Sequence, residues 1–110
     1  MEVVATARQV RVSPRKVRLV LDTVRGKPVD EALSILGFLP SPAGRTVAKV
    51  VKSAVANAEN NYQMSPDRLR IVKTFADAGM TLKRFRAGAR GRVNPFCRRF
   101  SHITVIVEEE

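Results

Sequence analysis

The stretch between Asp77 and Glu108 contains no acidic residue, although it is rich in arginine and lysine. Its basic residues are Lys83, Arg84, Arg86, Arg90, Arg92, Arg98 and Arg99. Arginine presents planar, bidentate donors, so the chemistry that this set favours is recognition of phosphate. Because the stretch cannot neutralise its own charge, we expect the counter-charge to come from outside the chain, most simply from nucleic acid.

A second basic cluster lies near the N-terminus, where no acidic residue occurs between Glu2 and Asp22. The cluster consists of Arg8, Arg11, Arg15, Lys16 and Arg18. It straddles a predicted helix start, where the positive end of the helix dipole would face the same phosphates as the side chains. A solvated helix face explains one such cluster about equally well, but two clusters in one small domain favour binding of a polyanion.

No set of residues typical of an enzyme is present. His102 is the only histidine, and without a positioned nucleophile or acid we expect it to be a hydrogen-bonded structural residue. Cys97 is the only cysteine, which excludes an intrachain disulfide and a Cys/His zinc site. The carboxylates are scattered along the chain. We therefore expect no catalytic residue, no metal, no cofactor and no small-molecule substrate.

The composition fits one small basic domain. The chain has 110 residues, 20 Lys and Arg against 10 Asp and Glu, a net charge of +10 and a pI near 11.1. Hydrophobic residues make up 45% of it, which is ordinary for a folded core and argues against a disordered basic tail. No apolar run approaches the ~20 residues of a membrane span. We expect a soluble cytosolic protein without a membrane partner.

Apolar residues recur at helical spacing in two segments of the N-terminal half. The first segment predicts a helix from Pro14 to Arg25, started by Ser13-Pro14 and ended by Gly26. The second predicts a shorter helix from Val29 to Leu36, with Gly37 as its terminator.

A third and longer helix is predicted from Pro42 to about Asn60, with Ser41 as its N-cap. The Asn60-Asn61 pair is expected to end it, because asparagine tolerates the left-handed conformation. The inward face of this helix is expected to contain Val47, Val50, Val51, Ala54, Val55 and Ala58.

Three segments rich in β-branched residues predict strands: Val3–Val10, Arg68–Asp77 and Ser101–Val107. The second alternates imperfectly, so a bulge is expected there. The third is the clearest strand, and it places Ile103, Val105 and Val107 on one face.

The basic stretch connects the last two predicted strands and is too long for an ordinary loop. Pairing of Asp77 near His102 would make it a hairpin with its tip near Ala89-Arg90, and arms of roughly 30 Å at ~3.3 Å per residue. The predicted fold is α+β, with three helices packed on a small antiparallel β-sheet and a long protruding basic β-hairpin. We expect a single domain, with a globular part of about residues 1–78 and 101–110 and a hairpin of about residues 79–100.

Four segments follow one another over nearly the whole chain in a specific combination. They are Arg11–Val20 (RVSPRKVRLV), Ser53–Asn61 (SAVANAENN), the LKRFR and ARGR runs of Leu82–Arg92, and Ser101–Val105 (SHITV). Each segment alone is moderately specific. Together and in register, they resemble the bacterial large-subunit ribosomal protein twenty-two family.

The resemblance implies a structural component of the large ribosomal subunit that binds large-subunit rRNA and bridges rRNA domains during assembly. It also implies neighbouring ribosomal proteins as partners and a ribosome-bound, cytoplasmic location. Carried over by position, the rRNA contacts are Ser13, Arg15, Lys16 and Arg18 in the globular part and the seven basic residues of the hairpin. Arg8 and Arg11 complete the predicted rRNA-binding set.

The resemblance further implies that the hairpin lines the nascent-peptide exit tunnel, where macrolide antibiotics bind close by. The expected tip, and so the expected neighbour of the nascent peptide, is Arg86, Ala87, Gly88, Ala89, Arg90 and Gly91.

The hairpin is also where the chain departs from the family pattern. Gly88 stands where members commonly carry arginine or lysine, Val93–Cys97 replaces a basic run that contains tyrosine, and Phe100 replaces a threonine. Pro95 has no N–H to give to a β-ladder, so we expect the return arm to be irregular there.

Two other functions are compatible with the charge. A free DNA- or RNA-binding regulator would grip a duplex with the first helix and the hairpin, and it would not follow ribosomal subunits. A small metal-dependent nuclease would need converging carboxylates, and the spacing of the acidic residues does not indicate them.

Overall fold

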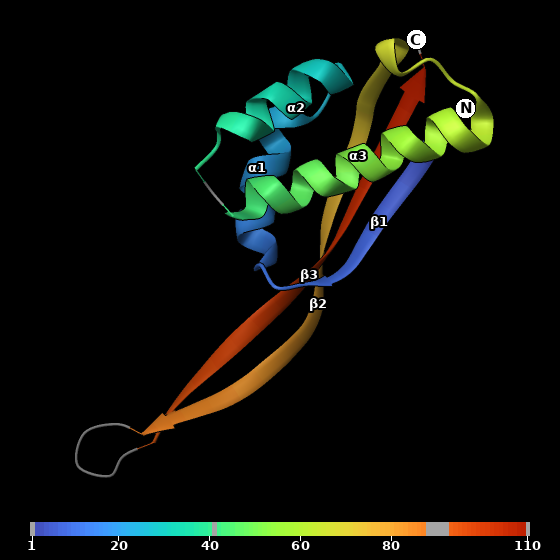
Figure 1. Ribbon diagram of the computed structural model, residues 1–110. Coiled ribbons are helices and arrows are strands. Elements are labelled where there is room, and N and C mark those ends of the chain that lie inside the picture. Colours follow the sequence, from blue (N-terminus) through green and yellow to red (C-terminus); the bar gives the residue numbers. More distant parts are fainter. Residues whose placement is uncertain (1, 41, 88–92, 110) are drawn as a thin grey trace.

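The computed structural model describes residues 2–40, 42–87 and 93–109, and it forms an α+β fold (Figure 1). Three helices and three antiparallel strands confirm the predicted class. A single 3₁₀ turn, Pro66–Arg68, leads into the second strand. In chain order the main elements are β1 (Glu2–Val10), α1 (Pro14–Val24), α2 (Val29–Phe38), α3 (Pro42–Tyr62), β2 (Leu69–Ala87) and β3 (Val93–Glu109).

The sheet has the strand order β1-β3-β2, so the last strand of the chain lies in the middle. Both pairings are antiparallel, and Asp77 lies opposite His102, as predicted. The β2–β3 register shifts between Ile71 and Lys73 and again between Ala78 and Thr81, which confirms the expected bulging of this strand.

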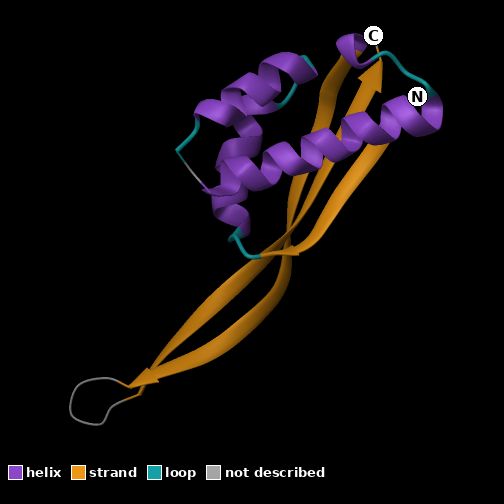
Figure 2. Cartoon of the chain, in the orientation of Figure 1, coloured by secondary structure: helices purple, strands orange, loops and turns teal. Residues whose placement is uncertain are grey.

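All three helices lie on one face of the sheet (Figure 2). The sheet contributes Ile103, Val105 and Val107 to the core, and all three are fully buried, as the alternation predicted. The predicted inward face of α3 is likewise buried, except that Val55 is only half-buried. Because β-branched and small residues dominate both layers, α3 can pack closely across the sheet.

The helix ends show where local signals were sufficient and where they were not. α1 ends at Val24, and Gly26 has a φ of 80°, which confirms it as the left-handed stop. Gly37 was predicted wrongly as a terminator, because α2 continues through it to Phe38. Ser41 lies outside the described residues.

α3 also runs past its predicted end, and Gln63, with a φ of 52°, takes the left-handed conformation expected of Asn60-Asn61. The Met64 N–H donates to the Ala58 carbonyl at 3.1 Å, so the chain turns back onto the last turns of the helix. Met64 packs against the core. The apolar contact made after the helix, rather than the preference of asparagine, therefore fixes where the turn occurs.

β2 and β3 continue beyond the helices as a two-stranded ladder, from Thr81 opposite Arg99 to Ala87 opposite Val93. The irregularity expected at Pro95 is absent, because Pro95 lies opposite Phe85 without a register shift. β3 pairs on only one side here, so alternate N–H groups point away from the ladder and a proline is tolerated. The molecule measures 61 × 25 × 17 Å, and its radius of gyration of 16.8 Å exceeds the ~13 Å of a compact domain of this length.

Candidate nucleic-acid interface

The ion pairs of the described residues gather at the end of the body that lies away from the hairpin. Two of them are local to the end of α1 and the start of α2, and two join the outer ends of the strands to each other or to the 3₁₀ turn. They are Arg25–Asp22 at 3.0 Å, Lys27–Glu31 at 3.7 Å, Arg68–Glu109 at 3.8 Å and Lys73–Glu2 at 3.7 Å. Exposed pairs of this kind add little stability, but they cancel the charge of the basic residues that they contain.

Toward the hairpin, the basic side chains that the structure describes have no such compensation from described neighbours. Nine of them form no ion pair within the described part of the chain. They are Arg8, Arg11, Arg15, Lys16, Arg18, Arg45, Lys49, Lys52 and Arg99, and all nine are exposed. The positive charge is therefore concentrated in the half of the molecule from which the hairpin projects, where it favours a polyanionic partner.

The two basic clusters found in the sequence meet at one place, which we call the hairpin-base hollow. This hollow of about 450 Å³ lies between the start of α1 and the strands where they leave the body. Arg15 and Arg18 line it from α1, and Arg99 lines it from β3. No carboxylate of the described residues lines it. Side chains more than eighty positions apart in the chain thus surround a single site suited to an anion.

Local structure fixes the α1 side of the hollow. Ser13 begins the helix through its carbonyl, which accepts the N–H of Lys16 at 3.1 Å, while its side chain makes no cap hydrogen bond. The predicted helix start is confirmed, and the Ser13 hydroxyl is left available at the wall of the hollow. The Nε of Arg18 donates to the Ala76 carbonyl at 3.0 Å, which orients the guanidinium group while its terminal nitrogens make no ion pair with a described residue.

A hydrogen-bonded clamp around Gln9 fixes the strand side. Gln9 sits at a register shift of β1 with a φ of 53°. Its N–H donates to His102 Nδ1 at 3.2 Å, and its Oε1 accepts the N–H of Met80 at 3.1 Å. A Cβ on Gly79 would lie 2.8 Å from that Oε1 and 3.2 Å from the Phe100 carbonyl oxygen, so a larger residue would push the Gln9 side chain out of the clamp and crowd the Phe100 backbone. The clamp ties β1 to the base of the hairpin.

His102 therefore has the structural role that its isolation in the sequence predicted. Its Nδ1 accepts a backbone N–H, and its neighbour Ser101 is fully buried and donates its hydroxyl to the Val12 carbonyl. Among the described residues, no group of three or more His, Cys, Asp or Glu is placed to hold a metal ion. None of the described helices is long and apolar enough to cross a membrane.

The other predicted contacts are distributed over several surfaces. Arg11 and Lys16 line a second hollow of about 200 Å³, between α1 and the start of α3, and do not join the hairpin-base hollow. Arg8 is exposed on β1 and lines neither hollow. Lys83, Arg84 and Arg86 belong to β2 and Arg98 to β3, so they follow the arms of the hairpin. Gly88, Ala89, Arg90, Gly91 and Arg92, with most of the expected tip, lie outside the described residues.

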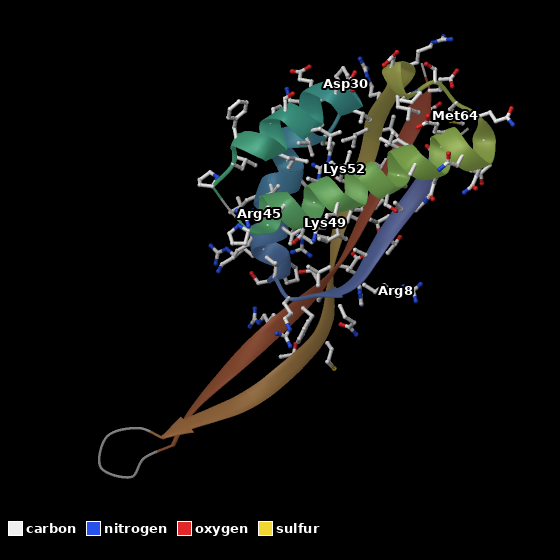
Figure 3. The ribbon with its side chains drawn as sticks, in the orientation of Figure 1. Arg8, Asp30, Arg45, Lys49, Lys52 and Met64 are labelled. Atoms are coloured by element: carbon white, nitrogen blue, oxygen red, sulfur yellow. The ribbon has the colours of Figure 1, made fainter. Side chains whose placement is uncertain are left out.

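The sequence reasoning missed one group of basic residues on α3, which form no ion pair with a described residue and are labelled in Figure 3. Arg45, Lys49 and Lys52 are spaced i, i+4, i+7, which places them on one helix face. The signal was present, because no acidic residue occurs between Glu31 and Glu59. By contrast, Arg25 forms an ion pair with Asp22, and its Nε donates a hydrogen bond to the Thr74 hydroxyl at 3.0 Å, so its role is structural.

Comparison with known proteins places nearly the whole chain in one family. Residues 5–108 match the family model described as "Ribosomal protein L22p/L17e". Two relatives named "Large ribosomal subunit protein uL22", from Thermoanaerobacter sp. (strain X514) and Thermoanaerobacter pseudethanolicus (strain ATCC 33223 / 39E), are each 56% identical over 110 residues. Each alignment covers 100% of this chain and 99% of the relative. The resemblance seen in the motifs is thereby confirmed, and the chain belongs to the ribosomal protein L22p/L17e family.

Proposed function

We propose that this chain is a structural, non-enzymatic component of the large ribosomal subunit that binds large-subunit rRNA, and that it resides on cytoplasmic ribosomes. Membership of a ribosomal protein family supports the assignment. The observation that carries the rRNA-binding part is the hairpin-base hollow, where two distant basic clusters converge without a carboxylate from the described residues.

The hollow would hold RNA by its backbone. Guanidinium groups of Arg15, Arg18 and Arg99 would make bidentate contacts with phosphate oxygens. The Ser13 hydroxyl and the positive end of the α1 dipole would add to the attraction. Contacts of this kind position a protein on RNA without reading its sequence, so specificity would come from the shape of the folded rRNA.

The hairpin would carry the same chemistry away from the body and so bridge separate rRNA domains during assembly. Its arms carry Lys83, Arg84, Arg86 and Arg98 on a ladder that extends past the helices. A two-stranded ladder with no covering layer is only marginally stable in water, so surrounding RNA would supply the layer that it lacks. Bridging would follow because the arms extend away from the hairpin-base hollow, so the two parts of this elongated molecule could contact different RNA segments.

The expected tip, Arg86 to Gly91, would line the nascent-peptide exit tunnel, and neighbouring ribosomal proteins would contact the remaining surface. The elongated shape supports this, since a hairpin can reach where the body cannot. A photo-reactive amino acid at Ala87 should crosslink to a stalled nascent chain, whereas the same probe at Thr104, on the body, should not. Equal crosslinking from both positions would contradict the tunnel assignment.

Sedimentation of the tagged protein from a cell lysate through a high-salt sucrose gradient tests the proposal as a whole. We expect stoichiometric comigration with the large subunit. Intact protein at the top of the gradient would contradict the ribosomal assignment and favour a free nucleic-acid-binding regulator.

A matched pair of double variants tests the hairpin-base hollow. Arg15→Gln with Arg99→Gln removes two charges that form no ion pair with a described residue, and Lys27→Gln with Lys73→Gln removes two charges that are paired with Glu31 and Glu2. For binding to a large-subunit rRNA transcript, the first pair should lower the slope of log affinity against log salt concentration by roughly 1.5. The second pair, with the same change in net charge, should leave the slope nearly unchanged. Equal effects would mean that net charge alone, and not the hollow, drives binding.

A further inference from the structure

Both outer strands of the sheet carry a β-bulge where the hairpin leaves the body. In β1, three residue steps lead from Ala7 to Val10, opposite two steps of β3. In β2, three steps lead from Ala78 to Thr81, again opposite two steps of β3. A bulge bends its strand and increases the local twist. The direction of the hairpin is therefore set at this level, and Figure 1 shows β2 changing direction there.

Gln9 occupies the bulge of β1 with a left-handed backbone, at a φ of 53°. Glycine is the usual residue at such a position, because a Cβ makes the conformation less favourable. Gln63 is the other described non-glycine residue with a positive φ, and it follows the end of α3, where this conformation is common. Gln9 ends no helix, so its side chain needs a different explanation.

The side chain of Gln9 holds the bulge of the opposite outer strand. Its Oε1 accepts the N–H of Met80, which lies inside the β2 register shift. Gly79 allows this approach, because a Cβ there would lie 2.8 Å from the same oxygen. The described side-chain hydrogen bonds from α1 and its C-cap reach β2 only at Thr74 and Ala76, on the body side of the shift. Among the described residues, the Gln9 amide is thus the side chain of the body that holds β2 closest to the hairpin.

Gln9 is itself fixed to the central strand. Its N–H donates to His102 Nδ1 at 3.2 Å, and the chain that follows is held where the Ser101 hydroxyl donates to the Val12 carbonyl. Both acceptor and donor belong to β3 within its buried, helix-covered part or directly beside it. The β2 bulge is therefore tied to a part of the sheet that apolar packing keeps in place.

A contribution to stability is the simplest alternative role for this hydrogen bond. Gln9 and Met80 are both exposed, so water competes for the bond and its contribution to the free energy of unfolding is small. The left-handed backbone of Gln9 acts against stability. Glycine at this position would remove that strain, but it would leave the bulge of β2 without the amide. The arrangement thus favours geometry over stability.

A small rotation at the bulge displaces the far end of the hairpin. The ladder from Thr81 to Ala87 spans about 20 Å at ~3.3 Å per residue. Rotation by about 10° at its base would move Ala87 by roughly 3.5 Å, which is as long as a hydrogen bond. One contact at the base can therefore decide which groups the arms of the hairpin reach.

We propose that Gln9 is a positioning residue that fixes the direction in which the hairpin leaves the body. Its amide holds the β2 bulge in one geometry before any partner is bound. The consequence for RNA rests on the proposed function: a hairpin that is already oriented gives up less conformational freedom on binding.

Distances between two spin labels measure this direction in the free protein. In a Cys97→Ser background, one label is attached at Ala87→Cys on the hairpin. The second is attached on the body, at Lys52→Cys in one protein and at Asp30→Cys in another. Lys52 and Asp30 are exposed on α3 and α2 (Figure 3), so the two distances together report a direction.

Three variants separate the amide from its backbone. Gln9→Asn suits the left-handed conformation, but its side chain is one methylene too short to reach Met80. It should shift or broaden the label distances by about 3 Å or more. Gln9→Glu keeps an acceptor oxygen at the same reach and should retain the distances of the unsubstituted protein. Gln63→Asn makes the same exchange at the other left-handed glutamine, away from the hairpin, and should leave the distances unchanged.

The inference would be overturned by unchanged distances in Gln9→Asn, or by equal changes in Gln9→Asn and Gln63→Asn. Equal changes in Gln9→Asn and Gln9→Glu would also contradict a role for the acceptor oxygen. Thermal unfolding of Gln9→Asn should remain within a few degrees of the unsubstituted protein, as roughly expected for an exposed hydrogen bond. A large loss of stability would instead assign Gln9 a role in holding the body together.

Binding to a large-subunit rRNA transcript tests the consequence for RNA. Gln9→Asn should lower the affinity by about two- to tenfold, the change in population that one hydrogen bond can cause. The slope of log affinity against log salt concentration should stay the same, because no charge is removed. Unchanged affinity with altered label distances would overturn this consequence. If the unsubstituted protein did not bind the transcript, the proposed function would fail, whereas the label distances would still decide the role of Gln9.

Discussion

The two ends of this molecule use the same elements for different purposes. At the end away from the hairpin, the sheet has three strands under three helices, and the exposed basic residues lie beside carboxylates. At the other end, two of the same strands continue without helices or a third strand, and the described basic residues near them are unpaired. The comparison teaches that one sheet serves two purposes: apolar burial stabilises one end, and the other end carries the unneutralised charge on which the proposed binding of RNA rests.

The largest expected contrast is in amide hydrogen exchange of the free protein. Amides of Ile103–Val107 lie in the buried centre of the sheet and should exchange only on global unfolding. Amides of Thr81–Ala87 and Val93–Arg99 should open at a cost several kcal/mol lower, because a two-stranded ladder lacks a covering layer. Bound rRNA should slow the exchange of the hairpin amides. Equal protection of hairpin and body amides from exchange in the free protein would show that the two ends do not differ in stability.

Truncation of a core side chain measures how much of the stability of the body depends on packing. Ile103→Ala should lower the free energy of unfolding by about 2–5 kcal/mol, because the side chain is fully buried between the sheet and the helices. Thr104→Ala, on the face of the sheet without helices, should cost less than about 1 kcal/mol. The midpoints of urea denaturation give both values. Similar losses at the two positions would show that the helix-covered face does not dominate stability.

Gly79 lies where the hairpin leaves the body, and its replacement tests how tightly the chain packs there. Gly79→Ala should destabilise the protein by about 1–2 kcal/mol, because the new methyl group would meet Gln9 Oε1 at 2.8 Å and the Phe100 carbonyl at 3.2 Å. Gly37→Ala is the matched control, since its new methyl group would meet nothing within 4 Å and the residue lies inside α2. That change should stabilise the protein by about 0.5–1 kcal/mol. Thermal unfolding measures both changes in stability. If the two substitutions shifted the stability in the same direction, the crowding assigned to Gly79 would be wrong.

The smallest expected effect concerns the ion pairs at the end away from the hairpin. Lys73→Gln breaks a pair of 3.7 Å between half-exposed side chains, so it should change the free energy of unfolding by no more than about 0.5 kcal/mol. The measurement is a urea titration at low and at moderate salt. A loss above about 1 kcal/mol would show that the pairs hold the body together as well as neutralising charge.

Much of the body could be predicted from the sequence, because its elements follow apolar periodicity and local caps. Ser13-Pro14 and Gly26 mark the two ends of α1 by rules that involve only neighbouring residues. The end of α3 escaped this reasoning because it depends on Met64, which turns back against a core that is assembled from distant elements.

The candidate site was predictable in composition but not in arrangement. The basic residues could be counted, but which of them are neutralised depends on the tertiary fold, as when Glu2 meets Lys73 across the sheet. The hydrogen bonds that tie β1 to the base of the hairpin also depend on the left-handed backbone of Gln9, which no turn residue in the sequence predicted. The stripe of Arg45, Lys49 and Lys52 was the exception, since spacing alone could have revealed it.

The central position of β3 also determines when this protein can fold. β1 and β2 each pair with β3 and not with one another, and β3 is the last element of the chain. While a ribosome is still synthesising this protein, the two earlier strands have no partner, and only the helices can form from local contacts. The sheet can close only after β3 has emerged from that ribosome, so the helices of a newly made copy can form before the sheet on which they pack is complete.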